Sequence, residues 1–258
     1  HKALVRDRLL HHAIYRILYP FFDRKFISDS YSCRDFKGTH RAIGRFNDFV
    51  RKVSRNNTRP CWVLKCDIRK FFASIDHEIL LNILRENIAD TDLLNLLSKI
   101  VGSFYSTQIG KGLPLGNLTS QLMVNIYLNK FDQWVKHYLK AKYYIRYADD
   151  FAFLSSDRDE LNKILPKISN FLGEKLKLDL HPNKVFIESI NSGVDFLGWV
   201  NFFDHRVLRT VTKTRMFRNI KNKEGKREAV ASYLGLMSHG NARKLQEKII
   251  KEYPISNA

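Results

Sequence analysis

Hydrophobic positions in the first 60 residues recur at helical spacing. Apolar side chains between residues 3 and 22 return every few positions, which predicts a helix that ends near Pro20. A second amphipathic pattern predicts a helix over residues 39–53. Its apolar side consists of Ala42, Ile43, Phe46, Phe49 and Val50. The polar run NNTRP at residues 56–60 then interrupts the helical pattern.

Short apolar runs in the middle of the chain predict strands. Residues 61–68 (CWVLKCDI) have the composition of a buried strand. Further strands are expected at 143–145, 151–154, 185–190 and 194–203, and helices at 77–86, 93–104, about 119–139 and 161–172. A Gly/Pro-rich loop is expected at 110–116, and a basic helical region with breaks near Gly225 and at 239–240 follows residue 212. The pattern therefore predicts an α+β fold with a helical C-terminal region.

The charge of the chain is concentrated at its two ends. The sequence has 44 Lys and Arg against 26 Asp and Glu, a formal net charge of +18. Residues 1–60 hold 14 basic and 5 acidic side chains, residues 201–258 hold 13 and 5, and the residues between them hold 17 and 16. One basic run is often only a solvated surface, but two basic regions around a neutral body favour a polyanion held from both sides. We therefore expect a nucleic acid as the partner.

The composition argues against several classes of protein. Hydrophobic residues make up 44% of the 258 residues and aromatic residues 12%, which is enough apolar surface for a folded core. Charges interrupt every apolar run before the roughly 20 residues that a membrane span needs, and no signal-peptide segment opens the chain. Three cysteines without a CxxC pair argue against a disulfide framework or a zinc site. We expect a soluble cytoplasmic protein without membrane contact.

Three aspartates are the candidates for chemistry. Asp67 lies at the end of the predicted 61–68 strand, and Asp149 and Asp150 interrupt two apolar strands in the segment IRYADDFAFL. A carboxylate at a strand end is often a helix cap, and adjacent acids are common in turns. Desolvating neighbouring carboxylates is costly without a cation, however, and Mg²⁺ prefers carboxylates together with substrate phosphates. In a basic protein these acids favour two-metal phosphoryl transfer on a nucleic acid.

Five segments resemble sequence motifs of reverse transcriptases, in the order and approximate spacing of that family. They are DIRKFFASIDH at 67–77, GLPLGNLTSQ at 112–121, YADD at 147–150, Asn183-Lys184, and FLGW at 196–199. The resemblance covers about residues 4–200. It implies a right-hand polymerase with fingers, an RRM-like antiparallel palm sheet and a short helical thumb.

The resemblance also implies domain boundaries. Residues 1–60 would form the fingers, 61–85 and 113–200 the palm, 86–112 an insertion between fingers and palm, and 201–258 a short basic thumb. The thumb region has room for two or three helices.

Within the family, the sequence resembles bacterial enzymes related to group II intron reverse transcriptases, and among these the enzymes of diversity-generating retroelements. Leu115 and Gln121 stand where most of the wider family carries Gln and Pro. Segments similar to that subgroup's fingers and thumb lie at 6–13, 29–31, 37–40, 232–235 and 239–241. Retron, CRISPR-associated and abortive-infection enzymes share a similar palm and remain alternatives. The implied location is the cytoplasm of a bacterial, archaeal or phage-infected cell.

The resemblance assigns roles to the acidic residues and to one lysine. Asp67, Asp149 and Asp150 would hold two Mg²⁺ ions, for which Mn²⁺ could substitute, with the carbonyl of Ile68 assisting. Lys184 would neutralise or protonate the departing pyrophosphate. A lysine that follows a His-Pro turn is otherwise an ordinary solvent-facing residue.

The resemblance also assigns nucleotide contacts. Phe72 would exclude a ribose 2′-hydroxyl by steric clash, whereas without the motif it would be a core aromatic. Arg34 and Lys37 would contact the triphosphate of the incoming dNTP, or else be surface charges. Gly116 and Gln121 would line the nucleotide pocket.

The last motif, Phe196, Leu197, Gly198 and Trp199, would form the primer grip, although large aromatic residues in a hairpin more often belong to its core. The partners implied by the resemblance are an RNA template with its primer and dNTPs. In the diversity-generating group, a small basic accessory protein is also expected.

Three functions other than an RNA-directed DNA polymerase are alternatives for this sequence. An RNA-dependent RNA polymerase would favour a small residue in place of Phe72. A defence polymerase could copy DNA or work without a template, and a non-catalytic RNA-binding module would be expected to have lost one of the three aspartates. All three acids and the bulky Phe72 are present. We therefore expect an enzyme that adds dNTPs to a primer 3′-hydroxyl on an RNA template.

Overall fold

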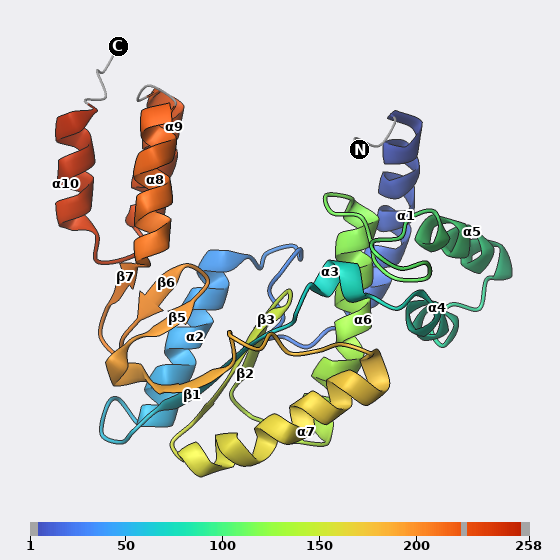
Figure 1. Ribbon diagram of the computed structural model, residues 1–258, viewed down its shortest axis with the longest axis horizontal. Helices are drawn as coiled ribbons and strands as arrows, with labels where there is room; N and C mark the ends of the chain where they lie inside the picture. Colours follow the sequence, from blue (N-terminus) through green and yellow to red (C-terminus); the bar gives the residue numbers. More distant parts are fainter. Residues whose placement is uncertain (1–4, 223–225, 254–258) are drawn as a thin grey trace.

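The computed structural model describes residues 5–222 and 226–253, which form two antiparallel sheets surrounded by helices (Figure 1). The helices are α1 (Val5–Asp23), α2 (Thr39–Ser54), α3 (Phe71–Ser74), α4 (His77–Arg85), α5 (Thr91–Gly102), α6 (Leu118–His137), α7 (Arg158–Leu176), the 3₁₀ turn η1 (Ile190–Ser192), α8 (Thr210–Asn222), α9 (Arg227–Met237) and α10 (Arg243–Glu252). The strands are β1 (Trp62–Asp67), β2 (Tyr144–Tyr147), β3 (Asp150–Ser155), β4 (Phe186–Ser189), β5 (Val194–Phe196), β6 (Trp199–Asn201) and β7 (Arg206–Leu208).

The larger sheet has the strand order β2-β3-β1-β4, with every neighbouring pair antiparallel. Leu64 and Cys66 of β1 belong to the core that the sheet forms with α6 and α7, whereas Val63 packs in the core formed with α2. Both faces of the sheet are therefore covered by helices. This explains why the 61–68 segment is apolar at nearly every position instead of alternating with polar residues.

The second sheet, β5-β6-β7, connects the larger sheet to the C-terminal helices. Phe196 packs on Phe46 of α2, with ring centroids 4.9 Å apart, while Trp199 lies in a separate core with α8, α9 and α10. Ile43 of α2 belongs to that third core as well. Helix α2 thus contributes to the packing of both sheets, and α8–α10 extend away from it (Figure 1).

Helix α1 runs beyond the predicted stop at Pro20 and packs on α6. Tyr19 and Phe22, on either side of the exposed Pro20, are buried in the main core. Their packing outweighs the hydrogen bond that proline cannot donate, so the helix continues to Asp23. Within the described part of the chain, no helix combines the length and the apolar character that crossing a bilayer requires.

The expected strand over 194–203 is instead a hairpin of β5 and β6. Leu197 and Gly198 form its two-residue turn, with φ angles of 53° and 85°. Positive φ at both central positions matches the twist of antiparallel strands. The short helix α3, the 3₁₀ turn η1 and the strand β7 are further elements that the pattern did not predict, because three or four residues are too few to show a period. The remaining predicted helices and strands are confirmed to within a few residues, whereas the predicted break near Gly225 lies outside the described residues.

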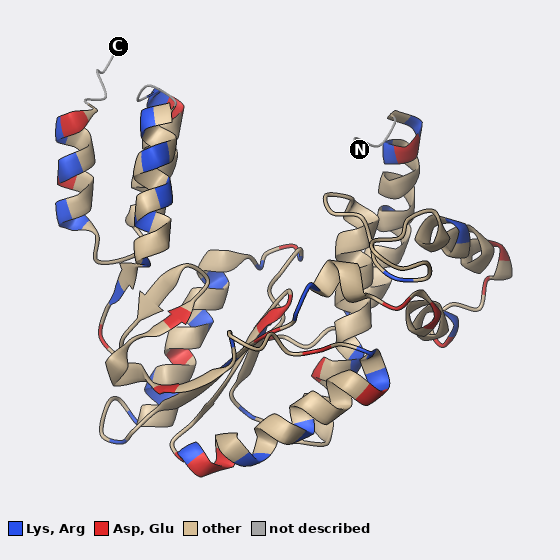
Figure 2. Ribbon diagram, viewed as in Figure 1, with Lys and Arg blue, Asp and Glu red and all other residues tan. Residues whose placement is uncertain are grey.

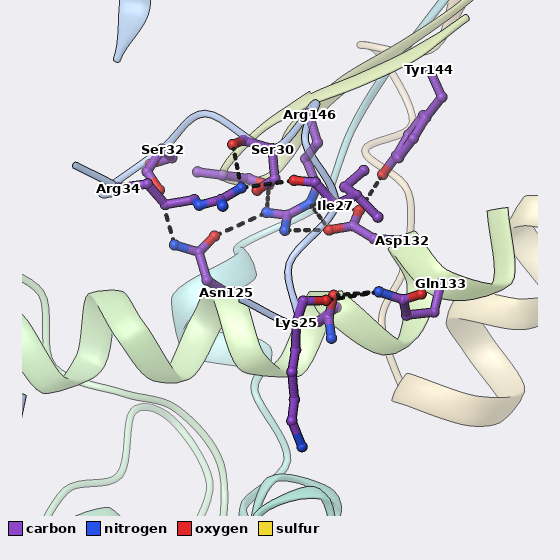
Figure 3. A network of polar contacts seen from close by, with 12 residues as sticks. Lys25, Ile27, Ser30, Ser32, Arg34, Asn125, Asp132, Gln133, Tyr144 and Arg146 are labelled. Atoms are coloured by element: carbon purple, nitrogen blue, oxygen red, sulfur yellow. Dashed lines mark hydrogen bonds and ion pairs between the residues drawn. The ribbon is translucent and has the colours of Figure 1, made fainter. Parts of the chain in front are cut away.

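A buried polar network lies between β2 and α6 (Figure 3). The guanidinium of Arg146 donates to both oxygens of Asp132 at 2.6–3.1 Å, and both side chains have 0% exposure. The hydroxyl of Tyr144 donates to the same carboxylate at 2.7 Å, and a further guanidinium nitrogen reaches the side-chain oxygen of Asn125 at 3.2 Å. Because the buried side-chain polar atoms of Arg146, Asp132, Tyr144 and Asn125 all have partners, the ion pair is accommodated inside the core.

The network also holds the segment before α2. The backbone N–H of Arg146 donates to the carbonyl of Asp29, and its carbonyl accepts from the N–H of Tyr31, both at 2.9 Å. The side-chain amide of Asn125 donates to the carbonyl of Ser32 at 2.9 Å. Residues 29–32 thus lie along the free edge of β2, where they cover backbone groups that would otherwise be unpaired.

We expect Asp132→Leu to lower the free energy of unfolding by about 3–5 kcal/mol, because it leaves a buried guanidinium without its counter-charge. Urea denaturation measures the change. Combining Asp132→Leu with Arg146→Met removes both charges and is expected to recover most of the loss. A single variant that loses less than about 1 kcal/mol, the value of an exposed ion pair, would contradict the structural role of the pair.

Candidate active site

The three aspartates lie together at one end of the larger sheet. Asp67 on β1 and Asp150 on β3 are direct register partners, and the N–H of Ile68 donates to the carbonyl of Asp149 at 3.2 Å. In Figure 2, red ribbon marks acidic residues at the turn between β2 and β3. Antiparallel pairing of two strands that are 82 residues apart in sequence therefore brings the carboxylates to one edge.

The backbone of the turn between β2 and β3 is held by the buried arginine. Ala148 has a φ of 53°, which is unfavourable for a residue with a Cβ. Its carbonyl accepts a hydrogen bond from the guanidinium of Arg146 at 3.1 Å. This contact stabilises the left-handed residue immediately before Asp149 and so orients both turn acids.

Asp150 faces a lysine that the sequence analysis did not single out. Nζ of Lys65, two residues before Asp67 on β1, lies 3.3 Å from Oδ2 of Asp150, and only 9% of its side chain is exposed. The other oxygen, Oδ1 of Asp150, is buried and has no hydrogen-bond partner. An unpaired buried carboxylate oxygen is energetically costly, so it marks a position where a further ligand would be favourable.

Asp67 faces the lysine that the sequence analysis did select. Nζ of Lys184 lies 3.1 and 3.2 Å from the two carboxylate oxygens of Asp67. A turn brings it there, because the N–H of His181 donates to the carbonyl of Asp67 and the N–H of Lys184 donates to the carbonyl of His181. Half of the Lys184 side chain is exposed, so it is free to move.

The environment shifts the acidity of both turn aspartates. Burial raises the pKa of Asp150 to about 7, against the opposing effect of the Lys65 ammonium. Burial also raises the pKa of Asp149, and the nearby Asp67 carboxylate adds to the increase. Both side chains therefore bind protons more readily than exposed aspartates do, which is the behaviour expected of clustered, desolvated acids.

The donor atoms fit a hard divalent cation. Three carboxylates and the carbonyl of Ile68 are oxygen ligands of the kind that Mg²⁺ binds, and Oδ1 of Asp150 lacks a partner. In the described residues, however, no three acidic, His or Cys side chains are already gathered as a metal-binding group. Two of the three carboxylates instead contact lysines, Asp150 with Lys65 and Asp67 with Lys184.

A largely apolar cavity of about 410 Å³ opens beside Asp149. Its lining includes Phe72, Phe104, Leu113 and Leu115. The N–H of Leu113 donates to the carbonyl of Phe72 at 2.8 Å, so the 112–116 loop is fixed to the segment after β1. The structure thus brings together two motifs that lie about 40 residues apart in the sequence.

Glycine is required at position 112 of this loop. Gly112 has a φ of 102°, and a Cβ there would lie 2.8 Å from the side chain of Ser106. The nearby residues Gly116 and Gln121, expected in the nucleotide pocket, are absent from the described lining of the cavity. Leu113 and Leu115 are the residues of the 112–121 segment that line it, and the nucleotide contacts of Gly116 and Gln121 stay predictions.

The two finger-region cations are engaged within the fold. Arg34 pairs with Asp23 at 2.7 Å and donates to the carbonyls of Ile27, Ser30 and Asp23, and its side chain is only 6% exposed. Most of its donors are therefore used within the fold, and its contact with a triphosphate stays a prediction. Lys37 donates to the carbonyl of Ser28 at 2.8 Å and lies over the ring of Tyr31.

The aromatic residues of the FLGW segment belong to the core. Phe196 and Trp199 are at most 1% exposed, which agrees with the alternative that large aromatic residues in a hairpin belong to its core. Their burial follows from the strand alternation of β5 and β6, which directs both rings inward. Only Leu197 and Gly198, at the turn of the hairpin, are partly exposed.

Sequence reasoning missed Lys65 and the Arg146–Asp132 pair. A signal was available for Lys65, since residues 65 and 67 point to the same face of a strand. None was available for Asp132, whose partner lies 14 residues away on another element.

Comparison with known proteins supports a relationship to reverse transcriptases. Residues 3–200 match the family described as reverse transcriptase (RNA-dependent DNA polymerase). The chain is 28% identical to "Protein YkfC" of Escherichia coli over 80% of its length and 61% of that protein. It is 24% identical to "Group II intron-encoded protein LtrA" of Lactococcus lactis, over 81% of this chain and 44% of that one. The chain thus spans less than two thirds of these relatives.

Solved structures share the fold. Telomerase from Candida tropicalis in complex with a fragment of telomeric RNA matches 93% of this chain and 44% of its own, with a TM-score of 0.60 and 13% identity. The apo telomerase of the same species, truncated from its C-terminal domain, matches 77% of this chain with a TM-score of 0.59. The α+β architecture is therefore that of a right-hand polymerase. By its match over residues 3–200, the chain belongs to the reverse transcriptase family.

Proposed function

We propose that the protein is an RNA-directed DNA polymerase that adds dNTPs to a primer 3′-hydroxyl. The observation that carries the proposal is the position of Asp67, Asp149 and Asp150 at paired strand ends, beside a cavity large enough for part of a nucleotide. Residues 61–85 and 113–200 would be the palm, 1–60 the fingers, 86–112 the insertion and 201–258 the thumb.

The three carboxylates and the carbonyl of Ile68 would hold two Mg²⁺ ions. When bound, such ions activate the attacking hydroxyl and stabilise the leaving pyrophosphate. Lys184 is placed to exchange its contact with Asp67 for one with a phosphate oxygen, because its side chain is half exposed. Lys65 would keep Asp150 in place from the buried side.

The basic C-terminal helices would bind the backbone of the primer–template. Figure 2 shows Lys and Arg positions repeated along α8 and α10. Among residues 201–258, 13 basic side chains stand against 5 acidic ones. Phosphate neutralisation of this kind provides sequence-independent affinity.

A narrower assignment, to the enzymes of diversity-generating retroelements, is supported by Leu115 and Gln121. Leu115 is exposed at the wall of the cavity, where an altered side chain would change how strictly a templating pair is tested. This assignment adds a small basic accessory protein as a partner.

Primer extension on an RNA template with Mg²⁺ and dNTPs tests the proposal. We expect Asp149→Asn to reduce the rate by about 10³-fold or more, because a charged metal ligand contributes several kcal/mol. Asp92→Asn, an equal charge change on the exposed start of α5, is the control and should retain the rate. Equal activity of the two variants would remove the metal-site argument.

The same assay tests the narrower assignment when each template base is scored for misincorporation. Errors concentrated at template adenines, which the resemblance to the diversity-generating group implies, would support the narrower assignment, and evenly spread errors would oppose it.

Phe72→Ala should relax the exclusion of ribonucleotides, because a smaller side chain leaves room for a 2′-hydroxyl in the cavity. We expect the ratio of dNTP to rNTP incorporation to fall by about 10²-fold, the effect of losing a few kcal/mol of steric discrimination. Single-nucleotide incorporation measures the ratio, and Phe72→Tyr, which keeps the bulk, should leave it unchanged. An unaltered ratio in Phe72→Ala would mean that the ring is only a core contact.

The extension rate at limiting Mg²⁺ should rise as the pH increases through about 7. Below that pH Asp150 holds a proton, which competes with the metal, and above it the carboxylate is free to bind. At saturating Mg²⁺ the midpoint should move to lower pH, since the metal then displaces the proton. Ionisation of the primer hydroxyl alone would give the same midpoint at both metal concentrations and would contradict this prediction.

A further inference from the structure

A basic cavity lies at the end of the larger sheet opposite the three aspartates. Its volume is about 360 Å³, which corresponds to roughly a dozen water molecules at about 30 Å³ each. It is bordered by the loop between α2 and β1, the segment before β2, and the start of α7, which lie on the far side of the sheet from the β2–β3 turn (Figure 1).

Five cationic side chains border this cavity and come from two separate segments. They are Lys52, Arg55, Arg59, Lys140 and Lys142. None of them forms an ion pair or a side-chain hydrogen bond within the described residues. The one carboxylate at the cavity, that of Glu160, accepts a hydrogen bond from Ser155 at 2.5 Å. One carboxylate against five cations leaves most of the positive charge of the cavity without a counter-charge from the lining residues.

An aromatic ring lies among these cations. Tyr143 is half-buried in the wall, with Nζ of Lys142 at 5.5 Å from its ring centroid. Leu154 and Leu161 form apolar parts of the same lining. Cations for phosphates together with an aromatic surface for a base are the combination that binds single-stranded nucleic acid.

The cavity is separate from the candidate active site. β3 begins at Asp150 and ends at Ser155, which lines the cavity, and five strand residues span about 17 Å. The helical and sheet core lies between the two ends. A nucleotide paired at the aspartates therefore cannot occupy the cavity as well.

We propose that this cavity is a second RNA-binding site, which holds an unpaired segment of RNA outside the primer–template. The site would retain a structured RNA on the protein while its templating part moves through the active site. The site depends on its own cations and on Tyr143, so it stands or falls separately from the polymerase proposal.

Fluorescence anisotropy with a labelled 12-nucleotide polyuridine tests the site on protein already saturated with an unlabelled primer–template hairpin. The test variant combines Lys52→Gln, Arg59→Gln and Lys142→Gln. The control combines Lys99→Gln, Lys167→Gln and Lys175→Gln, which remove the same charge from exposed positions on α5 and α7.

We expect the test variant to bind the polyuridine at least about tenfold more weakly than the control. The slope of log affinity against log salt should fall by about 2, since each phosphate of a single strand contributes roughly 0.7. Tyr143→Leu should weaken binding about fivefold or more without changing the slope, because it removes stacking and leaves the charge. Extension of a short hairpin primer should be unchanged in all these variants.

Equal affinities and equal slopes for the test and control variants would overturn the second site. Displacement of polyuridine by polyglutamate at equal charge concentration would also overturn it, because the cavity would then bind an acidic protein segment. If the hairpin fails to bind or to be extended, the polymerase proposal fails, while the comparison of the two variants on polyuridine still decides this site.

Discussion

A fully desolvated guanidinium requires several partners at once, and Arg146 obtains them from separate parts of the chain. Asp132 and Asn125 come from α6, the carbonyl of Ala148 comes from the turn, and residues 29–32 pair with the same strand. The conformation of the turn that carries two of the aspartates is therefore stabilised by contacts with these elements. The charge inside the core therefore couples the geometry of the site to the completion of the fold.

On the opposite face of the larger sheet, helix α2 likewise contacts separate parts of the chain. Phe46 packs against the hairpin of β5 and β6, and Ile43 reaches the core of α8–α10. The basic C-terminal helices are thus positioned through one amphipathic helix that precedes the first strand. Segments that are far apart in the sequence meet at α2. The position of the basic C-terminal region in the molecule therefore depends on the packing of this helix.

Periodicity and local chemistry made most of the fold and the position of the aspartates predictable. The apolar 61–68 segment predicts that strand β1 is buried, and the apolar residues on either side of YADD predict a turn between two strands. The burial of Arg34 and Trp199 could not be predicted, because it depends on tertiary packing. The same residue types serve in a binding site and in a core, and only the contacts of Arg34 with Asp23 distinguish the two uses. Asp132 could not be identified from a helical pattern at all.

The two lysines at the site have a consequence for how the protein is assembled. Lys65 and Lys184 supply two positive charges to three carboxylates, so the site carries little net charge before any ion arrives. The chain can then fold without waiting for a metal, unlike domains whose ligands repel one another until a cation binds. A divalent cation that enters later has to compete with ammonium groups already in place.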